Sequence, residues 1–451
     1  MMGNQSKMQG EKAIPAGYKL TEVGVIPGDW EVASLQDISS KITDGTHDTP
    51  KPAREGIPFL TAIHVKDGRI DFDSCYFLPE KIHNEIYCRC NPEFGDILMV
   101  NIGSGTATTA VVNVSYEFSL KNVALIKPRN TFSGFYINYA LSFSKAKIIE
   151  TISTGGAQPF LSLSQISQLR VAKPSFEEQT AIANVLSDTD ALITELEQLI
   201  TKKEAIRTAI MQQLLTGRTR LPQFSKNPDG TIKGYKSSEL GHIPEDWEVV
   251  KLKDVCFFEN GDRSSNYPTP DSFVESGIPF INAGHIGEGI INQRGMNFIT
   301  YKAFEKLGGG KVKPNDILFC LRGSLGKFGI VPDNFGIGAI ASSLVIIRTK
   351  QQVLLLDYFA SGYLKSSICE NMIELWAGGA AQPNLGAREL GNFLLPLPSV
   401  SEQRSIATIL SDMDAELTTL KRKLAKIHDI KQGMMQQLLT GRIRLPLEQQ
   451  P

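Results

Sequence analysis

Three stretches contain residues that could do chemistry, but none completes a catalytic motif. "GSGTAT" at Gly103 has two glycines of a dinucleotide-binding loop and lacks the third at the required spacing. "GGGKV" at Gly308 lacks the first glycine and the Ser or Thr of a phosphate-binding loop. We therefore expect turns at both places. No cluster of carboxylates and lysine typical of a nuclease is apparent, so we expect no catalytic residue in this chain.

Methyl transfer and metal binding are also poorly supported. "NPEF" at Asn91 is similar to an adenine-methyltransferase motif, but Glu93 puts a carboxylate where the amino group must be held. His64 and His285 occupy matching places and are expected to be structural. The six cysteines include no C-x-x-C pair, so neither a zinc site nor a disulfide framework is expected, and a reducing cytoplasm fits.

Composition indicates an ordinary soluble protein of several domains. The chain has 451 residues, of which 41% are apolar and 21% charged. It contains no run of 18 apolar residues, and its polar start is not a secretory signal. The net charge of −1 does not by itself suggest nucleic-acid binding, because phosphate contacts usually require a basic excess.

An internal repeat runs through nearly the whole chain. "MQQLLTGR" begins at Met211 and again at Met435, and "GYKLTEVGVIPGDWEV" at Gly17 is answered by "GYKSSELGHIPEDWEV" at Gly234. "GDILMVNIGS" at Gly95 likewise matches "NDILFCLRGS". The offset stays near 220 residues, so the chain is a duplication of one large unit rather than a solenoid of short repeats.

Each copy contains two parts of different character. The first part is rich in glycine, proline and short β-branched runs with interspersed helical stretches, which indicates an α+β domain. The second part is helical. The expected organisation is an N-terminal segment at 1–28, recognition domains at 29–173 and 246–397, helical regions at 174–222 and 398–446, a linker at 223–245 and a tail at 447–451.

The helical parts carry a heptad seam. Ser175 with Glu178, and Ser399 with Glu402, form the capping-box spacing directly after a proline. A glycine suited to a helix C-terminus follows each seam, at Gly217 and Gly441. Because the seams match, we expect the two helices to pack on each other as an antiparallel coiled coil with internal pseudo-twofold symmetry. The expected seam residues are Ile193, Leu196, Ile200, Ile206, Ile210, Leu214, Leu417, Leu420, Leu424, Ile427, Met434 and Leu438.

Two similar domains held by a rigid helical spacer are suited to hold two binding surfaces at a fixed separation. Duplex DNA has its own pseudo-dyad, and two-headed proteins read two half-sites on it. The residue pattern alone predicts two binding surfaces at a fixed separation and nothing more specific.

The doubled motifs closely resemble the specificity subunit of type I restriction-modification systems. The resemblance extends from about Gly17 to Pro446 and rests on the duplicated order of "GYKLTEVGVIPGDWEV", "DGTHDTP", the Gln-Pro turns, "EEQTAIANVLSDTDALI" and "MQQLLTGR". It implies that each domain reads one half of a bipartite, asymmetric site in double-stranded DNA. It also implies that the helices set the gap and dock two modification subunits, which bind S-adenosylmethionine and methylate adenine.

The resemblance further implies restriction subunits that use ATP and magnesium, while this chain holds no cofactor and catalyses nothing. In such an assembly other chains also clamp the DNA, so this chain need not be strongly basic. Two alternatives remain: a self-sufficient DNA adenine methyltransferase or nuclease, and a two-headed scaffold that binds proteins only.

Candidate DNA contacts are the polar side chains of two loops in each copy. Arginine suits guanine, whereas asparagine and glutamine suit adenine. The glycines before Ser104 and Ser324 could also let backbone amides approach phosphate. The candidates are Lys41, Thr43, Thr46, His47, Lys51, Arg54, Asn101, Ser104, Thr106 and Thr108 in the first copy, and Arg263, Ser264, Asn266, Tyr267, Arg322, Ser324 and Lys327 in the second.

Overall fold

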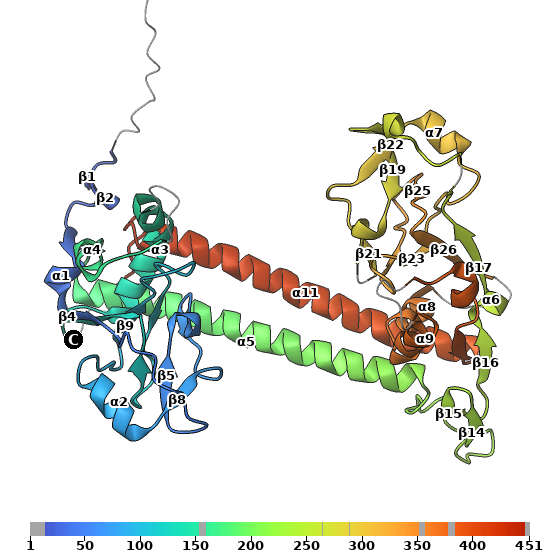
Figure 1. Cartoon of the computed structure of the whole chain (residues 1–451), viewed down its shortest axis with the longest axis horizontal. Helices are drawn as coiled ribbons and strands as arrows, with labels where there is room; N and C mark the ends of the chain where they lie inside the picture. The colour runs from blue at the N-terminus through green and yellow to red at the C-terminus, as the bar shows by residue number, and fades with distance from the viewer. Residues whose placement is uncertain are drawn as a thin grey trace, which may run out of the picture. The chain divides into compact units, whose positions relative to one another are not determined.

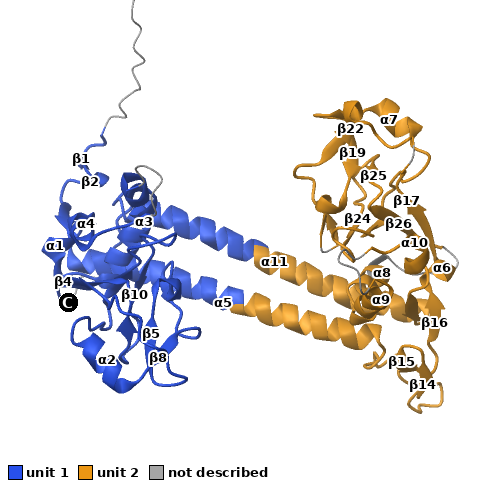
Figure 2. Ribbon diagram, viewed as in Figure 1, with its two compact units in different colours: residues 1–197, 422–451 blue, residues 198–421 orange. Residues whose placement is uncertain are grey.

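The computed structural model describes residues 14–152, 159–263, 265–287, 289–350, 357–377 and 384–446. The chain divides into two compact units, and each contains parts of both copies of the repeat (Figure 2). Unit 1 comprises residues 1–197 and 422–451, and unit 2 comprises residues 198–421. In the described part of the chain, no helix has the length and apolar character needed to cross a membrane.

Unit 1 is built around a four-stranded sheet of order β10-β9-β12-β4 and a three-stranded sheet of order β11-β5-β8. Strand β3 pairs with β13, β1 with β2, and β6 with β7 (Figure 1). The strands are β1 (Tyr18–Thr21), β2 (Gly24–Pro27), β3 (Glu31–Ser34), β4 (Ser39–Asp44), β5 (Ile57–Leu60), β6 (Val65–Lys66), β7 (Arg69–Ile70), β8 (Tyr76–Leu78), β9 (Ile97–Met99), β10 (Thr109–Val111), β11 (Ser119–Leu120), β12 (Ala124–Pro128) and β13 (Arg170–Lys173). The shorter helices are α1 (Leu35–Ile38), η1 (Ala62–His64), α2 (Glu80–Tyr87), α3 (Gly134–Ile152) and α4 (Leu163–Gln168).

Unit 2 repeats this architecture. Its sheets have the orders β17-β26-β23-β24 and β18-β22-β19-β25, with the pairs β16-β27, β14-β15 and β20-β21. The strands are β14 (Tyr235–Ser238), β15 (Gly241–Pro244), β16 (Glu248–Lys251), β17 (Cys256–Asn260), β18 (Phe273–Val274), β19 (Ile278–Ile281), β20 (Ile286–Gly287), β21 (Ile290–Ile291), β22 (Asn297–Ile299), β23 (Ile317–Cys320), β24 (Phe328–Ile330), β25 (Ala339–Ile340), β26 (Leu344–Thr349) and β27 (Leu394–Leu397). The shorter helices are α6 (Leu252–Val255), η2 (Pro270–Ser272), η3 (Ala283–His285), α7 (Tyr301–Lys306), α8 (Asp357–Leu364), α9 (Ser367–Ala377) and α10 (Ala387–Leu390).

One inner strand of the β10-β9-β12-β4 sheet and one of the β17-β26-β23-β24 sheet are buried on both faces. In β9, Ile97 and Met99 join the core under α3, while Leu98 joins a second core on the other face. In β23, Ile317 and Leu318 divide between two cores in the same way. This explains why "DILMV" and "DILFC" read as continuous apolar runs instead of alternating with polar residues.

Two long helices complete both units. Helix α5 (Phe176–Leu215) has 40 residues and α11 (Val400–Leu438) has 39, so each begins well before its heptad seam. Within unit 1, Lys431 of α11 bonds Asp190 of α5 at 2.5 Å. Within unit 2, Arg207 of α5 pairs with Asp414 of α11. Each unit has a second ion pair, Glu178 with Arg444 in unit 1 and Lys203 with Glu416 in unit 2. In both units the number of the partner residue falls as α5 advances, so the helices pack antiparallel in each unit.

The seam is apolar except at one place. The predicted residues Ile193, Leu196 and Ile200 are buried, but Ile206 is 40% exposed and does not belong to the seam. The inward positions after Ile200 are instead Lys203 and Arg207, which form ion pairs with Glu416 and Asp414. Of the other predicted seam residues, Leu214, Leu417, Ile427 and Leu438 are buried, and Ile210, Leu420, Leu424 and Met434 are half-buried.

Each long helix starts on a buried glutamate that is held by an arginine from the end of the other long helix. Glu178, near the start of α5, accepts the indole N–H of Trp30 at 3.0 Å and a hydrogen bond from Arg444 Nη2 at 2.9 Å. Ser175 caps α5 as predicted, but the Glu178 carboxylate does not complete the capping box because these two partners occupy it. Arg444 also bonds Asp29 and lies 5.6 Å from the Trp30 ring centroid.

Unit 2 contains the same arrangement, but the copies of the repeat that supply the arginine and the glutamate are exchanged. Trp247 Nε1 donates to Glu402 at 3.0 Å, and Arg220 bonds Glu402 at 2.7 Å and Asp246 at 2.8 Å. Arg220 comes from the first copy of the repeat and Glu402 from the second, whereas in unit 1 the arginine comes from the second copy. Each unit is therefore completed by the other half of the chain.

Gly217 and Gly441 end the long helices with φ of 69° and 65°, as the sequence predicts. A Cβ on Gly441 would collide with the Pro27 ring and meet Trp30. We expect Gly441→Ala to lower the free energy of unfolding by about 2 kcal/mol or more, from left-handed strain and the clash. Gly433→Ala is the matched control: it lies inside α11 with open space at its Cβ, and it should stabilise the protein by about 1 kcal/mol. Urea unfolding measures both, and equal effects of the two changes would contradict the assignment.

The unit 2 network also predicts a pH dependence. Burial alone would raise the pKa of Asp246, but hydrogen bonds from Arg220 and Lys233 lower that pKa from 3.8 to about 2. A depressed carboxylate pKa adds stability that is complete above about pH 4 and is lost as the pH falls toward 2. The melting temperature of Asp246→Asn should therefore lie below wild type above pH 4 and approach it between pH 4 and 2. A difference in melting temperature between wild type and Asp246→Asn that persists unchanged at pH 2 would disprove this. Asp271→Asn, at an exposed aspartate, is the control.

Candidate DNA interface

In unit 1 the first predicted contact loop begins later than expected. Lys41 and Thr43 lie in strand β4 rather than in a loop, because this segment pairs with β12. The loop proper follows Asp44, and its predicted residues Thr46, His47, Lys51 and Arg54 are exposed or half-buried. Lys41 lies exposed on the edge strand and donates to the carbonyl of Arg89 at 2.9 Å.

A buried carboxylate holds an exposed arginine and an exposed histidine at this loop. Asp44, 6% exposed, accepts from Arg89 Nη2 at 2.9 Å and contacts His47 Nε2 at 3.2 Å. The other ring nitrogen of His47 lies 2.8 Å from the Asn122 side-chain oxygen. The side chains of His47 and Arg89 are both more than half exposed. Both ring nitrogens of His47 have partners in the protein, so Arg89 is the side chain that keeps unpaired donors toward solvent. Arg89 did not appear among the predicted residues, since no local pattern links it to a carboxylate 45 residues away.

The second predicted loop of unit 1 is mostly a scaffold. Asn101, Thr106 and Thr108 are buried, so they are not free to read bases. Thr106 Oγ1 bonds the carbonyls of Gly103 and Pro159, and Thr108 accepts from Lys145 at 3.0 Å. Ser104 alone among the four predicted side chains is exposed, directly after Gly103, whose φ is 97°.

In unit 2 the first loop presents Arg263 at the place that matches His47. The Arg263 Nη2 donates to the carbonyl of Ser342 at 3.3 Å, and Ser342 corresponds to Asn122 in unit 1. The two side chains thus rest on the same turn with different chemistry. Asn266 is exposed, but Tyr267 packs edge-on against Phe280 in a core and serves as an anchor.

The second loop of unit 2 presents the guanidinium of Arg322, which is hydrogen-bonded to a neighbouring side chain. Arg322 Nε donates to the Asn384 side-chain oxygen at 3.0 Å, which leaves both terminal nitrogens available. Gly323 and Gly326 have φ of 79° and 85°, and they fold the loop so that Lys327 is exposed and Ser324 half-buried. The predicted candidate Ser264 and the predicted turns at Gln158 and at Gln382–Pro383 lie outside the described residues.

The matched histidines fold turns. His64 Nδ1 accepts from the Thr61 amide at 2.9 Å, and His285 Nδ1 accepts from the Asn282 amide at 3.1 Å. Their Nε2 atoms lie within hydrogen-bond distance of the carbonyls of Ser74 and Gly295. Burial lowers the pKa of His64, which is consistent with a neutral ring in this turn. Within the described ranges, no three His, Cys, Asp or Glu side chains are grouped to hold a metal ion.

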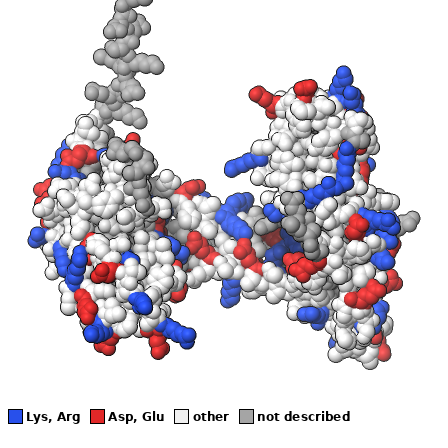
Figure 3. All heavy atoms as spheres, in the orientation of Figure 1, with Lys and Arg blue, Asp and Glu red and all other residues white. Residues whose placement is uncertain are grey.

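Charge on the exposed surface is mixed. On the face drawn in Figure 3, basic and acidic side chains are interspersed over both units. Basic groups gather locally instead, as at the Asp44 loop, where Lys121 bonds Thr49 beside His47 and Arg89. A near-neutral chain can therefore still present donors at selected loops.

The fold and these loops define a protein of two similar units that present different polar side chains on a duplicated frame. Residues 27–207 and 244–429 match the family described as the type I restriction modification DNA specificity domain. The chain belongs to this family, whose specificity subunits are non-catalytic.

Relatives of similar length are named specificity subunits of type I restriction enzymes. The type I restriction enzyme MjaVIII specificity subunit of Methanocaldococcus jannaschii is 27% identical over 436 residues, which cover 93% of this chain and 94% of the relative. A second protein of that organism, provisionally named the MjaX specificity subunit, is 29% identical over 439 residues, covering 95% and 97%. A crystal structure of the type I S subunit from M. genitalium matches with a TM-score of 0.57 at 16% identity, covering 91% of this chain and 96% of that one. This likeness agrees with the predicted fold.

The Asp44 cluster supplies a prediction. Asp44→Asn removes the charge that orients Arg89 and His47, so we expect the affinity for a target duplex to fall about tenfold, the loss of roughly 1.4 kcal/mol. Asp48→Asn, an exposed aspartate in the same loop, is the control and should leave affinity unchanged or slightly higher. Fluorescence anisotropy on the assembled complex makes the comparison. Equal affinities for wild type and Asp44→Asn would show that the cluster does not contact DNA.

Proposed function

We propose that this chain is the DNA-reading and assembly-organising subunit of a type I restriction-modification complex. Unit 1 reads one half of a bipartite asymmetric site in double-stranded DNA, and unit 2 reads the other. The observation that supports this most strongly is a duplicated frame with divergent loops. The buried glutamate at the start of the long helix has the same tryptophan and arginine partners in both units. In contrast, His47 in unit 1 is matched by Arg263 on the same turn of unit 2.

The partners follow from the same proposal. Two modification subunits dock on the helical regions and bind S-adenosylmethionine, and restriction subunits supply ATP- and magnesium-dependent translocation and cleavage. Helix α5 offers an apolar surface for such docking: Leu199 and Ile206 are 39% and 40% exposed and are seven residues apart, so they lie on one face.

The near-zero net charge favours a scaffold that binds proteins only. The orientation of exposed donors by buried or paired groups argues against it, because a scaffold has no need of Asp44 behind Arg89 or Asn384 behind Arg322. Sequence-dependent DNA binding by the complex with its modification subunits distinguishes the two functions.

Base reading should be separable between units. Arg263→Ala should relax or change the bases read in one half-site only, and His47→Ala should affect only the other half. A bidentate arginine contact with guanine contributes about 1–3 kcal/mol of discrimination. Binding to a library of duplexes with each half randomised measures both variants. Equal losses over both halves would mean that these side chains contact phosphate instead.

The helices should act as a ruler. Seven residues inserted in α5 after Leu199, together with seven in α11 after Arg422, keep the heptad and the facing register. They add about 10 Å of helix at about 1.5 Å per residue, which corresponds to roughly 3 base pairs at about 3.4 Å each. The half-sites should stay the same while their gap grows by that amount, as read from methylated motifs. Seven residues inserted after Asp229, in the linker, should change nothing; an unchanged gap after the helix insertions would refute the ruler.

A further inference from the structure

The eight residues 211–218 are repeated without change at 435–442. Most of these side chains have a visible structural task. Met211, Leu214 and Leu215 are buried, as are Leu438 and Leu439 in the second copy. Thr216 and Thr440 each bond a carbonyl one turn earlier, and Gly217 and Gly441 adopt positive φ against a proline.

The last residue of the repeated segment has no such task. Arg218 and Arg442 are exposed, and neither guanidinium makes a hydrogen bond or ion pair with any residue of the described ranges. The arginines that close the units lie two positions later, at Arg220 and Arg444. The fold therefore gives no reason for an identical arginine at both places. Both positions also fall outside the residues matched to the family, 27–207 and 244–429.

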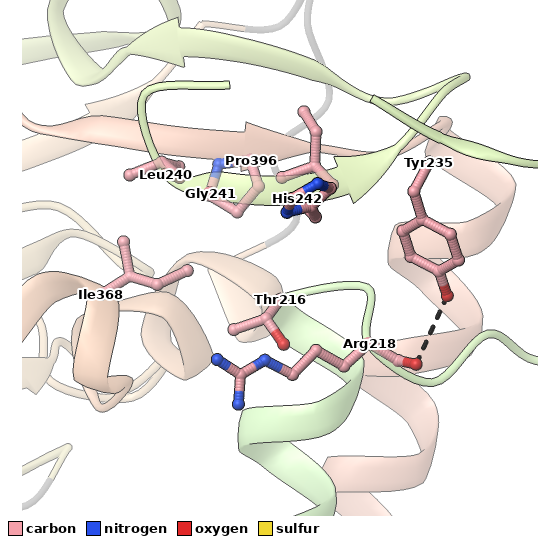
Figure 4. A pocket seen from close by; sticks show the side chains of 9 residues that line it. Thr216, Arg218, Tyr235, Leu240, Gly241, His242, Ile368 and Pro396 are labelled. Carbon is pink, nitrogen blue, oxygen red and sulfur yellow. Dashed lines mark hydrogen bonds between the residues drawn. The ribbon is translucent and has the colours of Figure 1, made fainter. Parts of the chain in front are cut away.

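In unit 2 the free arginine lies at a cavity. Arg218 extends from the end of α5 beneath the β14–β15 hairpin, toward Ile368 of α9 (Figure 4). The cavity has a volume of about 710 Å³, and its walls include Leu240, Ile243 and Pro396. Tyr235 is fixed beside it by hydrogen bonds to the carbonyls of Gly217 and Arg218.

This combination selects a particular ligand chemistry. An unpaired guanidinium is a bidentate donor for a carboxylate. Aliphatic walls next to it suit an apolar side chain that anchors a polypeptide in a pocket. A DNA backbone offers phosphates without an apolar anchor, and no residue of the two candidate DNA loops of unit 2 lines this cavity. The chemistry favours a protein segment that carries an acidic residue beside an apolar one.

The corresponding region of unit 1 has a related form. The tip of the β1–β2 hairpin, at Val23, lines a cavity of about 410 Å³ together with Ile148 of α3 and Leu169. Val23 corresponds to Leu240 in the repeat, and Arg442 follows Gly441 as Arg218 follows Gly217. Arg442 is not among the residues that line this cavity. The match between the units is the exposed arginine itself and the adjacent hairpin, whose tyrosine (Tyr18 or Tyr235) donates to the carbonyl of the preceding glycine.

We propose that Arg218 and Arg442 are two equivalent docking points, each of which binds an acidic, apolar-anchored segment of one modification subunit. The inference rests on the proposed function, because it takes the modification subunit as the partner present in two copies. It adds the residues at which each copy is held and the chemistry of the segment that they hold. Retention of the arginine in both copies follows, since the same partner surface must be bound twice.

The test uses the full chain and the modification subunit of its own system. Native mass spectrometry gives the stoichiometry, and titration gives the affinity of each copy. Arg218→Glu and Arg442→Glu should each weaken one of two copies at least tenfold, so that a two-to-one complex becomes one-to-one, and the double variant should bind neither copy. Lys226→Glu, an exposed basic residue of the linker outside the cavity, makes the same change of charge and is the control. Unchanged melting temperatures show that the variants fold.

The outcomes separate this inference from the proposed function. If the wild-type chain binds no modification subunit, the proposed function fails and the inference fails with it. If the wild type binds two copies and the double variant still binds two with equal affinity, only the inference is overturned. If subunit binding is unchanged but DNA affinity falls, the arginines contact phosphate, and the docking assignment is wrong.

Discussion

The structure depends on the neutralisation of one buried carboxylate at the start of each long helix. Glu178 and Glu402 are 2% exposed, and an unpaired charge at that depth would cost several kcal/mol. The compensating arginine comes in each case from the end of the other long helix, and a buried tryptophan adds a third contact. This requirement forces the two helices to run antiparallel in each unit. It also means that neither copy of the repeat can form a complete unit from its own residues.

A frame fixed in this way leaves the loops free to differ. The four-stranded sheet built on β9 or β23, the turn histidines and the helix ends are duplicated. The side chains that contact the turn at Asn122 and Ser342 differ, because one is an imidazole and the other a guanidinium. Changes at those positions leave the contacts of the buried glutamate with its arginine and tryptophan unaltered. Such a separation between a constant frame and variable contacts is what a protein needs to acquire new DNA targets without loss of assembly.

The duplication made the fold largely predictable, because matched segments at a steady offset identify the units, the helices and the terminal glycines. Long-range pairing limited the rest. Ile206 was wrongly placed in the seam, since sequence reasoning does not expect Lys203 and Arg207 to turn inward toward acidic partners. Thr106 and Thr108 looked like polar loop residues but bond neighbouring groups below the surface. Arg89 was missed because its link to Asp44 exists only after β4 and α2 have packed.

The central claim is that this chain determines which DNA sequence its complex modifies. Single-molecule mapping of N6-methyladenine in the source genome, with the gene present, deleted and restored, tests it directly. We predict that one bipartite motif is methylated, disappears on deletion and returns on restoration, with two half-sites separated by a fixed gap. Persistence of the same motif after deletion would contradict the claim.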